Sequence, residues 1–490
     1  MAAPSDPEAA ITAAIRLREA GQCEAAAALL TQALHHHPRN PRLWQTLGTV
    51  HRAAESSAAA ATAFSKAARL APHDPKAAQG IAQASLEAGR RAAALFEAAH
   101  RLAPGDGSIL LGRAAAQLAE GRASEAIATL DAIVAANSLW LEGQRTLAQL
   151  RWQMDDTPGF TTGYARALSD NPRQPALWCA LIDLLLHVER WEQARAIIAE
   201  ARRAIGDIPA LALPAAICAS ERGDSAADAL FARLPATDVA AIEHRARHLL
   251  RTGRADAASA VLAPALERAG AERLWPYASL AWRMTGDPRA EWLEGDAALV
   301  SVVDLDMNAA LPALAERLRG LHRAKRDPLG QSVRGGTQTD GPLFAHEAPE
   351  IRDLRARIVE AVNAHLTRLG AREARHPTRR YLGKRWRFAG SWSVRLSGEG
   401  HHAPHVHPLG WISSACYIAL PPQQDMGASP AGWLQLGAPP PALALSLEPF
   451  RRIEPKPGRL VLFPSTMWHG TAPIAGGERL TVAFDVAAIG

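Results

Sequence analysis

The feature that most constrains the fold is a repeat of about 34 residues in the first half of the chain. Its clearest unit spans residues 41–72, where large, small and helix-ending residues hold fixed positions: Trp44, Leu47, Gly48, His51, Ala60, Phe64, Ala67 and Pro72. The small residues let two helices approach closely, and the aromatic residues fill the groove between them. Pro72 stops the second helix, because proline cannot continue it. The unit therefore predicts a helix-turn-helix pair.

The same period recurs along the chain. Pro38 and Pro72 are 34 residues apart, Pro104 follows after 32 residues, and Pro172 and Gly206 continue the spacing. The pattern resembles the tetratricopeptide repeat and predicts roughly seven or eight helix-turn-helix units over residues 7–290, stacked as a superhelix. The resemblance implies that this array carries no chemistry of its own and that its concave face binds a protein or peptide partner.

From about residue 290 the signals change to strands and helices. The pattern predicts helices at 309–322 and 349–369, and strands at 300–305, 386–396, 411–420, 432–436, 459–463 and 479–486. The polar, glycine-rich residues 328–344 are predicted to be a loop, either functional or a mobile surface segment. Short strands between proline and glycine turns predict a sandwich or barrel, and we expect a jelly roll with helices packed outside.

Three histidines and an arginine in this second part indicate chemistry. His405 and His407 are two residues apart, so on an extended strand they point the same way and can share a metal ion with His469. Arg479 stands ten residues after His469, and Thr481 follows two residues later. A guanidinium and a hydroxyl on one strand face suit a carboxylate. The pattern suggests an iron oxygenase with an acidic co-substrate.

Several segments together resemble the Fe(II)- and 2-oxoglutarate-dependent oxygenases, and more narrowly an oxygenase family that often follows tetratricopeptide repeats. They include Ser391–Leu396, His405–Pro408, Gly458–Pro464, Trp468–Gly470 and Glu478–Thr481. The resemblance implies a double-stranded β-helix, with a repeat domain at residues 1–290 and an oxygenase domain at 291–490, its core at about 380–488. It also implies that Arg479 and Thr481, with Tyr417 adding a hydrogen bond, bind 2-oxoglutarate, and that Fe(2+) and dioxygen complete the site.

The sequence departs from that family at the second metal ligand. The broad superfamily places iron on H-x-D and a distal histidine, and here His407 replaces the aspartate. His407 is either a ligand, giving a three-histidine site, or lies outside the ligand shell with water in its place, or the site has lost iron. Arg479 has the alternative of a surface salt bridge with Glu478. His401 and His402 are expected in a loop at the mouth of the site.

Four functions remain open from the sequence. The first is a dioxygenase that hydroxylates a protein or peptide recruited by the repeats. The second is a non-catalytic repeat adaptor with a degenerate oxygenase fold, and the third is a small-molecule hydroxylase. A three-histidine cupin-type dioxygenase without 2-oxoglutarate is the fourth, and it would leave Arg479 without a role.

Composition argues against several other classes of function. The net charge of +5 comes from 54 basic and 49 acidic residues spread over the chain, so we expect no nucleic-acid partner. No basic and apolar leader opens the sequence, and no apolar run reaches the roughly 18 residues that span a membrane. The four cysteines are far apart without C-x-x-C spacing, which suits a reducing cytoplasm.

Overall fold

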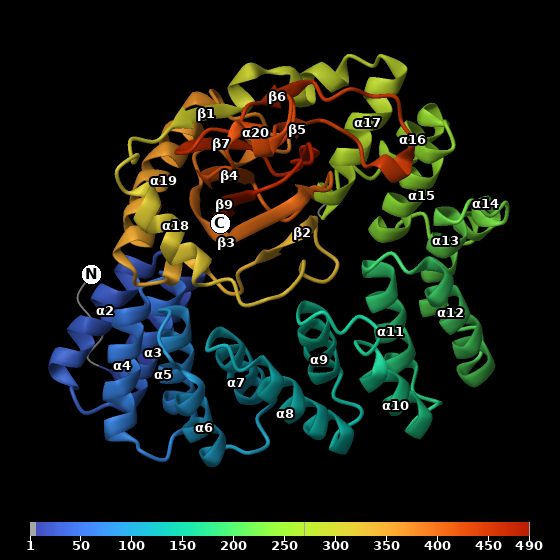
Figure 1. The fold of residues 1–490 in the computed structure, drawn as a ribbon. Helices are drawn as coiled ribbons and strands as arrows, with labels where there is room; N and C mark the ends of the chain where they lie inside the picture. The colour runs from blue at the N-terminus through green and yellow to red at the C-terminus, as the bar shows by residue number, and fades with distance from the viewer. Residues whose placement is uncertain (1–5, 269, 490) are drawn as a thin grey trace.

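The computed structural model describes residues 6–268 and 270–489, so residues 1–5, 269 and 490 of the two expected domains lie outside the described residues. The first part of the chain is helical, and consecutive helices lie side by side (Figure 1). These helices are α1 (Pro7–Glu19), α2 (Cys23–His36), α3 (Pro41–Ala53), α4 (Ser57–Leu70), α5 (Pro75–Glu87), α6 (Ala93–Leu102), α7 (Gly107–Ala119), α8 (Ala123–Ala136), α9 (Leu141–Gln153), α10 (Thr162–Asp170), α11 (Pro175–His187), α12 (Trp191–Ile205), α13 (Ala212–Glu221), α14 (Ala227–Ala232), α15 (Val239–Arg251), α16 (Ala255–Leu262) and α17 (Trp275–Thr285).

The first helix of each early repeat begins at an encoded cap. Helices α1, α3 and α5 start at a proline that follows Asp6, Asn40 or Asp74, and the side chain of that preceding residue accepts hydrogen bonds from first-turn N–H groups. The helix leaves those N–H groups without internal partners, and proline at the first position loses no bond. The three caps recur every 34 residues, so the sequence period is also the period of the helix starts.

Phe64 explains how neighbouring repeats pack. Its ring on α4 lies between Gly48 of α3 and Gly80 of α5, and a Cβ at Gly48 would lie 2.8 Å from the ring. Only glycine leaves room for the ring at that distance, so the prediction that small residues allow close helix packing is confirmed. The stacked pairs confirm the predicted superhelix of tetratricopeptide type.

Two antiparallel sheets follow the helices. The larger has the strand order β1-β7-β4-β9-β3-β2, and the smaller has the order β6-β5-β8. This antiparallel region after a helical array confirms the predicted fold class and is consistent with a jelly roll. The strands and added helices are β1 (Ser301–Asp304), α18 (Leu311–Arg319), β2 (Val333–Gln338), α19 (Pro349–Arg368), β3 (Arg385–His402), β4 (Ile412–Ala419), α20 (Gln423–Met426), β5 (Leu434–Leu436), β6 (Arg451–Ile453), β7 (Arg459–Pro464), β8 (His469–Thr471) and β9 (Glu478–Ile489).

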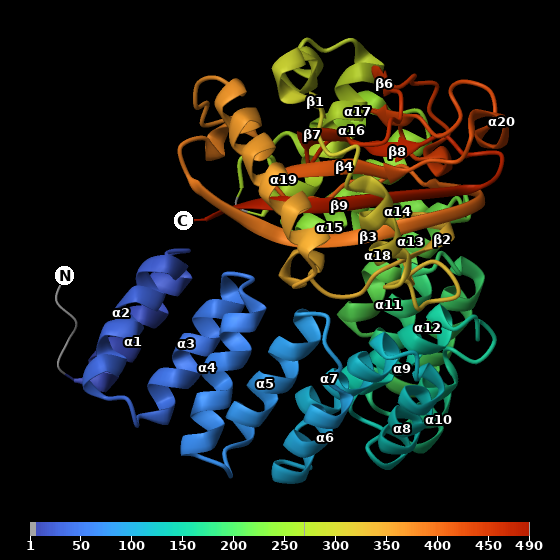
Figure 2. The ribbon, with the colours of Figure 1, turned by 60° about the vertical axis from the view of Figure 1, so that its left-hand side comes forward.

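Strand β9 separates an apolar core from a polar cavity. Leu480 and Phe484 join the core beneath α18 and α19, which lie against the larger sheet (Figure 2). Arg479, Thr481 and Asp485 lie on the opposite side and line a cavity. Alternate residues of a strand point to opposite faces. One strand therefore supplies both the core and the functional side chains.

The prediction that residues 328–344 form a loop was wrong for the middle of that segment. Residues 333–338 form β2, which pairs with β3. A Cβ at Gly336 would lie 2.5 Å from the carbonyl oxygen of Arg395, so the strands approach too closely for a side chain there. Glycine therefore stands in this strand where an alternating apolar residue would be expected, and the sequence does not show the usual strand pattern. Strand β3 also extends to His402, which places His401 and His402 on a strand and not in the expected loop.

The repeat helices curve around the sheets and contact them at both ends of the arc (Figure 1). Gly21, between α1 and α2, packs against Ile489 at the end of β9. At the other end, Tyr277 of α17 packs against the ring of Trp468. The concave side of the array therefore faces the chain's own C-terminal part. Ion pairs along the arc are Glu55–Arg355, Arg90–Glu347 and Glu272–Arg380.

A segment between α18 and β2 lies on the inner side of the array. The backbone N–H of Lys325 donates to the carbonyl of Gln153 at 2.8 Å, and the indole of Trp152 donates to the carbonyl of Asp327 at 3.0 Å. Leu329 packs against the apolar cluster around α9–α12. This segment leads directly into Gln331 and Ser332, which line the cavity.

None of the helices in the described part of the chain combines the length and apolar character that a bilayer-crossing segment needs.

Candidate metal centre

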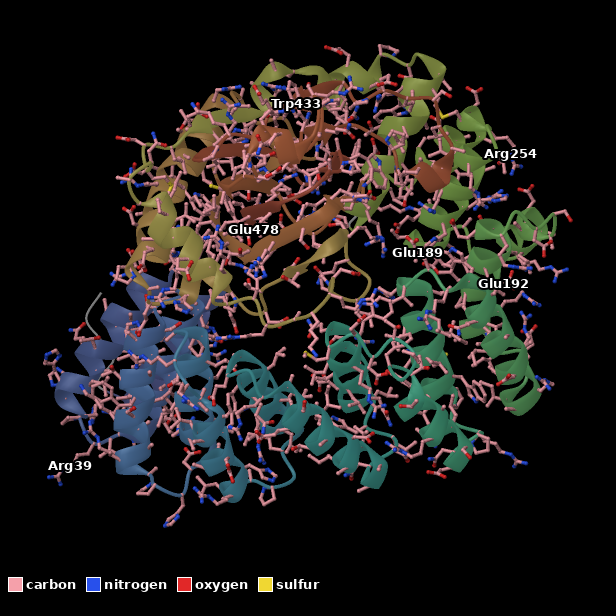
Figure 3. All side chains as sticks on the ribbon, viewed as in Figure 1. Arg39, Glu189, Glu192, Arg254, Trp433 and Glu478 are labelled. Atoms are coloured by element: carbon pink, nitrogen blue, oxygen red, sulfur yellow. The ribbon has the colours of Figure 1, made fainter. Side chains whose placement is uncertain are left out.

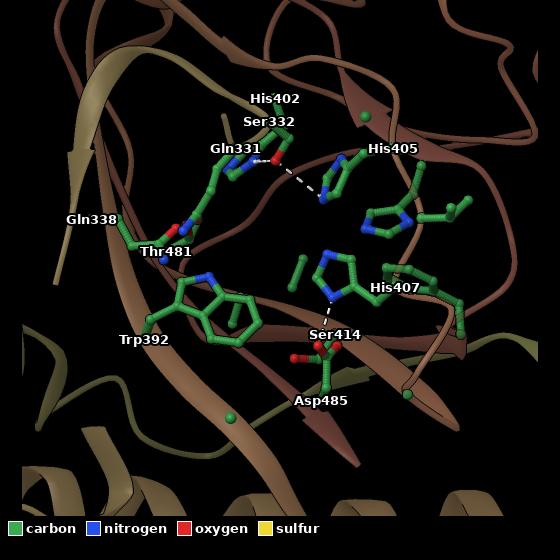
Figure 4. A pocket seen from close by; sticks show the side chains of 18 of the residues that line it. Gln331, Ser332, Gln338, Trp392, His402, His405, His407, Ser414, Thr481 and Asp485 are labelled. Carbon is green, nitrogen blue, oxygen red and sulfur yellow. Dashed lines mark hydrogen bonds and ion pairs between the residues drawn. The ribbon is translucent and has the colours of Figure 1, made fainter. Parts of the chain in front are cut away.

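His405 and His407 lie close together at one side of the cavity (Figure 4), and His469 lines the same cavity. Their possible ligand atoms all lie within 4.8 Å of one another. His405 and His469 form an isolated β-bridge, in which each backbone N–H donates to the other's carbonyl, at 2.9 and 3.0 Å. His469 is the first residue of β8, while His405 and His407 follow the end of β3 in an extended segment and not in the predicted strand. Three histidines this close together could hold one metal ion.

Hydrogen bonds fix which nitrogen of each ring is free. The Nδ1 of His405 lies 2.9 Å from the carbonyl oxygen of Ala403, and the Nδ1 of His469 lies 2.9 Å from that of Met467. A carbonyl oxygen only accepts, so Nδ1 carries the hydrogen in both rings. The lone pair is then on Nε2, which is the atom that a metal ion needs.

The Nδ1 of His407 is hydrogen-bonded to a carboxylate, whereas the Nδ1 atoms of His405 and His469 are bonded to backbone carbonyls. Its Nδ1 lies 2.6 Å from a carboxylate oxygen of Asp485, and the hydroxyl of Ser413 donates to the other oxygen at 2.6 Å. An ionised carboxylate only accepts, so Nδ1 of His407 carries a hydrogen and Nε2 is the nitrogen that is left to face a metal ion. Carboxylates in this position orient a histidine ligand and make it more basic. The resembling oxygenases have an aspartate at position 407, and here a carboxylate instead lies behind the histidine at that position.

Burial keeps the rings of His402, His405 and His469 neutral. Burial, reinforced by the neighbouring imidazoles, lowers the pKa of His405 and of His469 well below the ordinary histidine value. Burial and the charge of Arg479 lower the pKa of His402 to about 3. Neutral imidazole is the form that binds a metal ion.

Arg479 is a buried cation without an anionic partner. Its side chain is 1% exposed, and Nη1 donates to the carbonyl of Gly432 at 3.1 Å. Its Nε has no hydrogen-bond partner, and among the described residues it forms no ion pair. The predicted alternative, a surface pair with Glu478, is wrong: Glu478 (labelled in Figure 3) pairs with Arg319 and Arg395.

Tyr417 and Thr481 lie near that guanidinium. The ring of Tyr417 is 5.0 Å from Cζ of Arg479, and its buried hydroxyl has no partner. Burial raises the pKa of Tyr417, so the hydroxyl keeps its hydrogen and can donate it. Thr481 lines the cavity two residues after Arg479 on the same face of β9. A buried cation with an unpaired Nε, next to an unpaired phenol hydroxyl, is the environment that a carboxylate ligand would satisfy.

The cavity is large enough for more than one small molecule. Its volume is about 710 Å³. Trp392 lies against His407, with ring centroids 5.8 Å apart, and Gln338 lies near Thr481 (Figure 4). Ser332 contacts Nε2 of His405 at 3.2 Å and Nδ1 of His402 at 3.3 Å. The cavity thus joins the histidine cluster to the arginine side.

Sequence reasoning found the main residues and missed their neighbours. His405, His407, His469, Arg479 and Thr481 all line one cavity as their spacing predicted, whereas Tyr417 does not line it and packs in the cluster that contains Phe463. Asp485 was missed, although the period of two that links 479 to 481 continues to 485. Ser332 and Gln338 were missed because the segment that carries them was predicted as a loop. No local pattern could have paired them with His402 or Thr481.

Comparisons with known proteins agree with the division into a repeat array and a β region. Residues 390–485 match a family model described as "Putative 2OG-Fe(II) oxygenase". Residues 11–75 and 90–150 match two tetratricopeptide repeat models. Comparison with curated proteins gives no match.

Solved structures similar to this chain include both repeat proteins and an oxygenase. A thermophilic TPR protein of Thermus thermophilus is 19% identical, with 35% of this chain and 95% of that chain covered and a TM-score of 0.28. A Pseudomonas putida prolyl-4-hydroxylase is 19% identical, with 39% and 94% covered and a TM-score of 0.28. YrrB, a TPR protein with an unusual peptide-binding site, is 18% identical, with 36% and 91% covered and a TM-score of 0.28. At these scores the similarities carry no functional argument.

Proposed function

We propose that this chain, which joins tetratricopeptide repeats to a region of the 2OG-Fe(II) oxygenase family, is an Fe(II)- and 2-oxoglutarate-dependent dioxygenase that hydroxylates a protein or peptide. In this proposal residues 1–290 form the recruiting domain and residues 291–490 the oxygenase domain. The observation that carries the proposal is the buried guanidinium of Arg479, which has an unpaired Nε and forms no ion pair with any described residue, in the cavity that the three histidines line. A metal site alone would not require it.

The residues would divide the work by chemistry. His405, His407 and His469 would bind Fe(II) through Nε2, and Asp485 would hold His407 in place. Arg479 would pair with the outer carboxylate of 2-oxoglutarate, with Tyr417 and Thr481 donating hydrogen bonds. Iron and 2-oxoglutarate, when bound, supply the oxidation: dioxygen, 2-oxoglutarate and a substrate C–H bond give succinate, carbon dioxide and a hydroxylated carbon.

The chain's own groups would position the reactants and limit water. The apolar rings of Phe463 and Trp392 line the cavity on either side of the histidines. Leu409, which is 93% exposed, stands at the rim. A substrate side chain entering here would contact Trp392 and Leu409 before it reached the metal. Excluding water around the iron favours the productive reaction over side reactions.

The repeat array would deliver the substrate along its inner side. Residues 325–330 already cover the inner side of α9 and α11, and they lead to the cavity. A flexible peptide lying beside this segment would reach the rim at Leu409. The proposal therefore favours an extended peptide segment as the substrate.

The first test is turnover of 2-oxoglutarate. The purified chain, loaded anaerobically with Fe(II) and then given 2-oxoglutarate and air, is expected to release succinate, and His469→Ala is expected to stop it. Proteins captured on the chain would then be searched by mass spectrometry for the mass of one added oxygen atom. Protein capture that is unaffected by His469→Ala, with no succinate from the unaltered chain, would instead favour a non-catalytic adaptor.

A further inference from the structure

The segments that carry the three histidines have a second, apolar side. Val406 lies between His405 and His407, and Trp468 directly precedes His469. Val406 and Trp468 both pack with the apolar cluster of α15, α16 and α17. Adjacent residues of an extended chain point in opposite directions. The imidazoles therefore face the cavity while Trp468 faces the repeat helices; Val406 packs against the same helices and also lines the cavity.

Trp468 is held by α17 through two different contacts. Its indole Nε1 donates to the carbonyl of Pro276 at 2.9 Å. Its ring meets the ring of Tyr277 edge to face, with centroids 5.6 Å apart and planes at 83°. The side chain of Trp468 is 4% exposed. A hydrogen bond and a ring contact together fix both the position and the rotation of the residue next to His469.

A third contact from α17 reaches the backbone of Trp468 through Gly437. Arg283 of α17 donates to the carbonyl of Gly437. The N–H of Gly437 in turn donates to the carbonyl of Trp468 at 2.7 Å. Helix α17 thus holds both the side chain and the backbone of Trp468, and His469 follows it by one peptide bond.

We propose that α17 is part of the metal site, with Trp468, Val406 and Tyr277 as positioning residues that aim the histidine ligands. The inference rests on the proposed function only for the metal and not for the reaction. Residues that orient metal ligands from outside the ligand shell change metal affinity by about 10- to 100-fold. In this view the last repeat helix supports the metal ligands from outside the cavity and is also part of a recruiting array.

The test compares two tryptophans that make the same hydrogen bond. Trp178 in α11 donates its Nε1 to the carbonyl of Pro172 at 2.8 Å and is 6% exposed, but it packs among α9–α12. In the full chain, Trp468→Phe and Trp178→Phe remove equivalent bonds. Co(II) serves as the probe, because its visible spectrum reports the ligand geometry. We expect Trp468→Phe to weaken Co(II) binding about 10-fold and alter the spectrum, and Trp178→Phe to change neither.

A second pair of variants acts from the repeat side alone. Tyr277→Leu removes the ring that contacts Trp468, and Tyr277→Phe keeps it. Tyr277→Leu is expected to weaken Co(II) binding several-fold, whereas Tyr277→Phe is expected to bind Co(II) as tightly as the unaltered chain. Far-UV circular dichroism checks that each variant is folded. Co(II) affinity and spectrum unchanged in both Trp468→Phe and Tyr277→Leu would overturn the inference.

The outcomes also separate this inference from the proposed function. If the unaltered chain binds Co(II) but the Fe(II) form releases no succinate, the proposed function fails. The variant affinities then still decide the positioning role. If the unaltered chain binds no Co(II), both are overturned.

Discussion

Arg479 has an environment that is costly without a ligand. A guanidinium that is 1% exposed and has an unpaired Nε leaves hydrogen-bonding capacity unused in a low-dielectric site. Burial lowers its pKa, yet arginine stays charged at neutral pH. A bound carboxylate would satisfy both the charge and the donor.

The first prediction concerns this charge. Arg479→Met should leave the ligand-free chain at least as stable, because it removes a buried unpaired cation. The same change should weaken 2-oxoglutarate binding about 100-fold. Thermal unfolding with Mn(II), with and without 2-oxoglutarate, measures both effects. Arg395→Met, which removes an exposed partner of Glu478, should keep the full 2-oxoglutarate-dependent rise in Tm. An equal rise in Arg479→Met would contradict the assignment.

The second prediction concerns the carboxylate behind His407. Asp485→Asn keeps an acceptor near Nδ1 but removes the charge, and we expect about 10-fold weaker Co(II) binding. Asp304→Asn is the matched control, since Asp304 pairs with Lys456 and Arg459 and does not line the cavity. Isothermal titration calorimetry gives both affinities. Equal affinities in the two variants would mean that His407 is not a ligand.

At the scale of elements, short segments outside the regular strands position two of the three histidines. His405 and His407 lie in a segment with one isolated bridge, and their orientation comes from backbone bonds to His469 and Ser465. The turns between repeat helices are equally specific. Gly89 and Gly121 end α5 and α7 with the same φ of +78°, yet only Gly89 touches the C-terminal part.

These two glycines give the third prediction. Alanine at either position adopts an unfavourable left-handed backbone, at a cost of about 1 kcal/mol. At Gly89 the new Cβ would also overlap the ring of His346, whereas at Gly121 it would meet open space. We expect Gly89→Ala to lower the free energy of unfolding by at least about 2 kcal/mol in urea titrations, and Gly121→Ala by about half that. Equal losses would mean that the array and the β region dock loosely.

At the scale of the whole molecule, buried histidines join distant elements. His365 of α19 bonds Ser301 of β1, with its Nδ1 2.7 Å from the hydroxyl. His322 bonds Thr337 of β2 and Ser393 of β3. Burial lowers the pKa of His322, His365 and His376 to about 4 each. All three are therefore neutral in the folded chain.

The fourth prediction follows from that shift. In the unfolded chain these histidines bind protons below about pH 6.5, whereas in the folded chain they do so only near pH 4. As the pH falls between these values, protons bind to the unfolded state and favour it. The free energy of unfolding should fall by about 2 kcal/mol for each histidine between pH 6.5 and 5. His365→Gln should reduce this slope in urea titrations, and the exposed His73→Gln should not. A slope that His365→Gln leaves unchanged would refute the assignment.

The sequence predicted what short-range patterns encode. The caps at Asp6, Asn40 and Asp74 and the small residues around Phe64 set the repeat, because they act on neighbouring turns. The same holds for the alternation that places Arg479 and Thr481 on one face. Prediction from the sequence failed at β2, because the glycines that let β2 approach β3 closely do not show the usual strand pattern.

Sequence patterns were enough to predict the helical array, the antiparallel β region, and the set of three histidines and one arginine. The three-dimensional fold was needed to find that Asp485 lies behind His407, that Glu478 pairs with Arg319 and Arg395, and that α17 holds Trp468. The physical reason is distance along the chain. Periodicity reports which face a side chain takes, but its partner across the fold depends on how the sheets and helices pack.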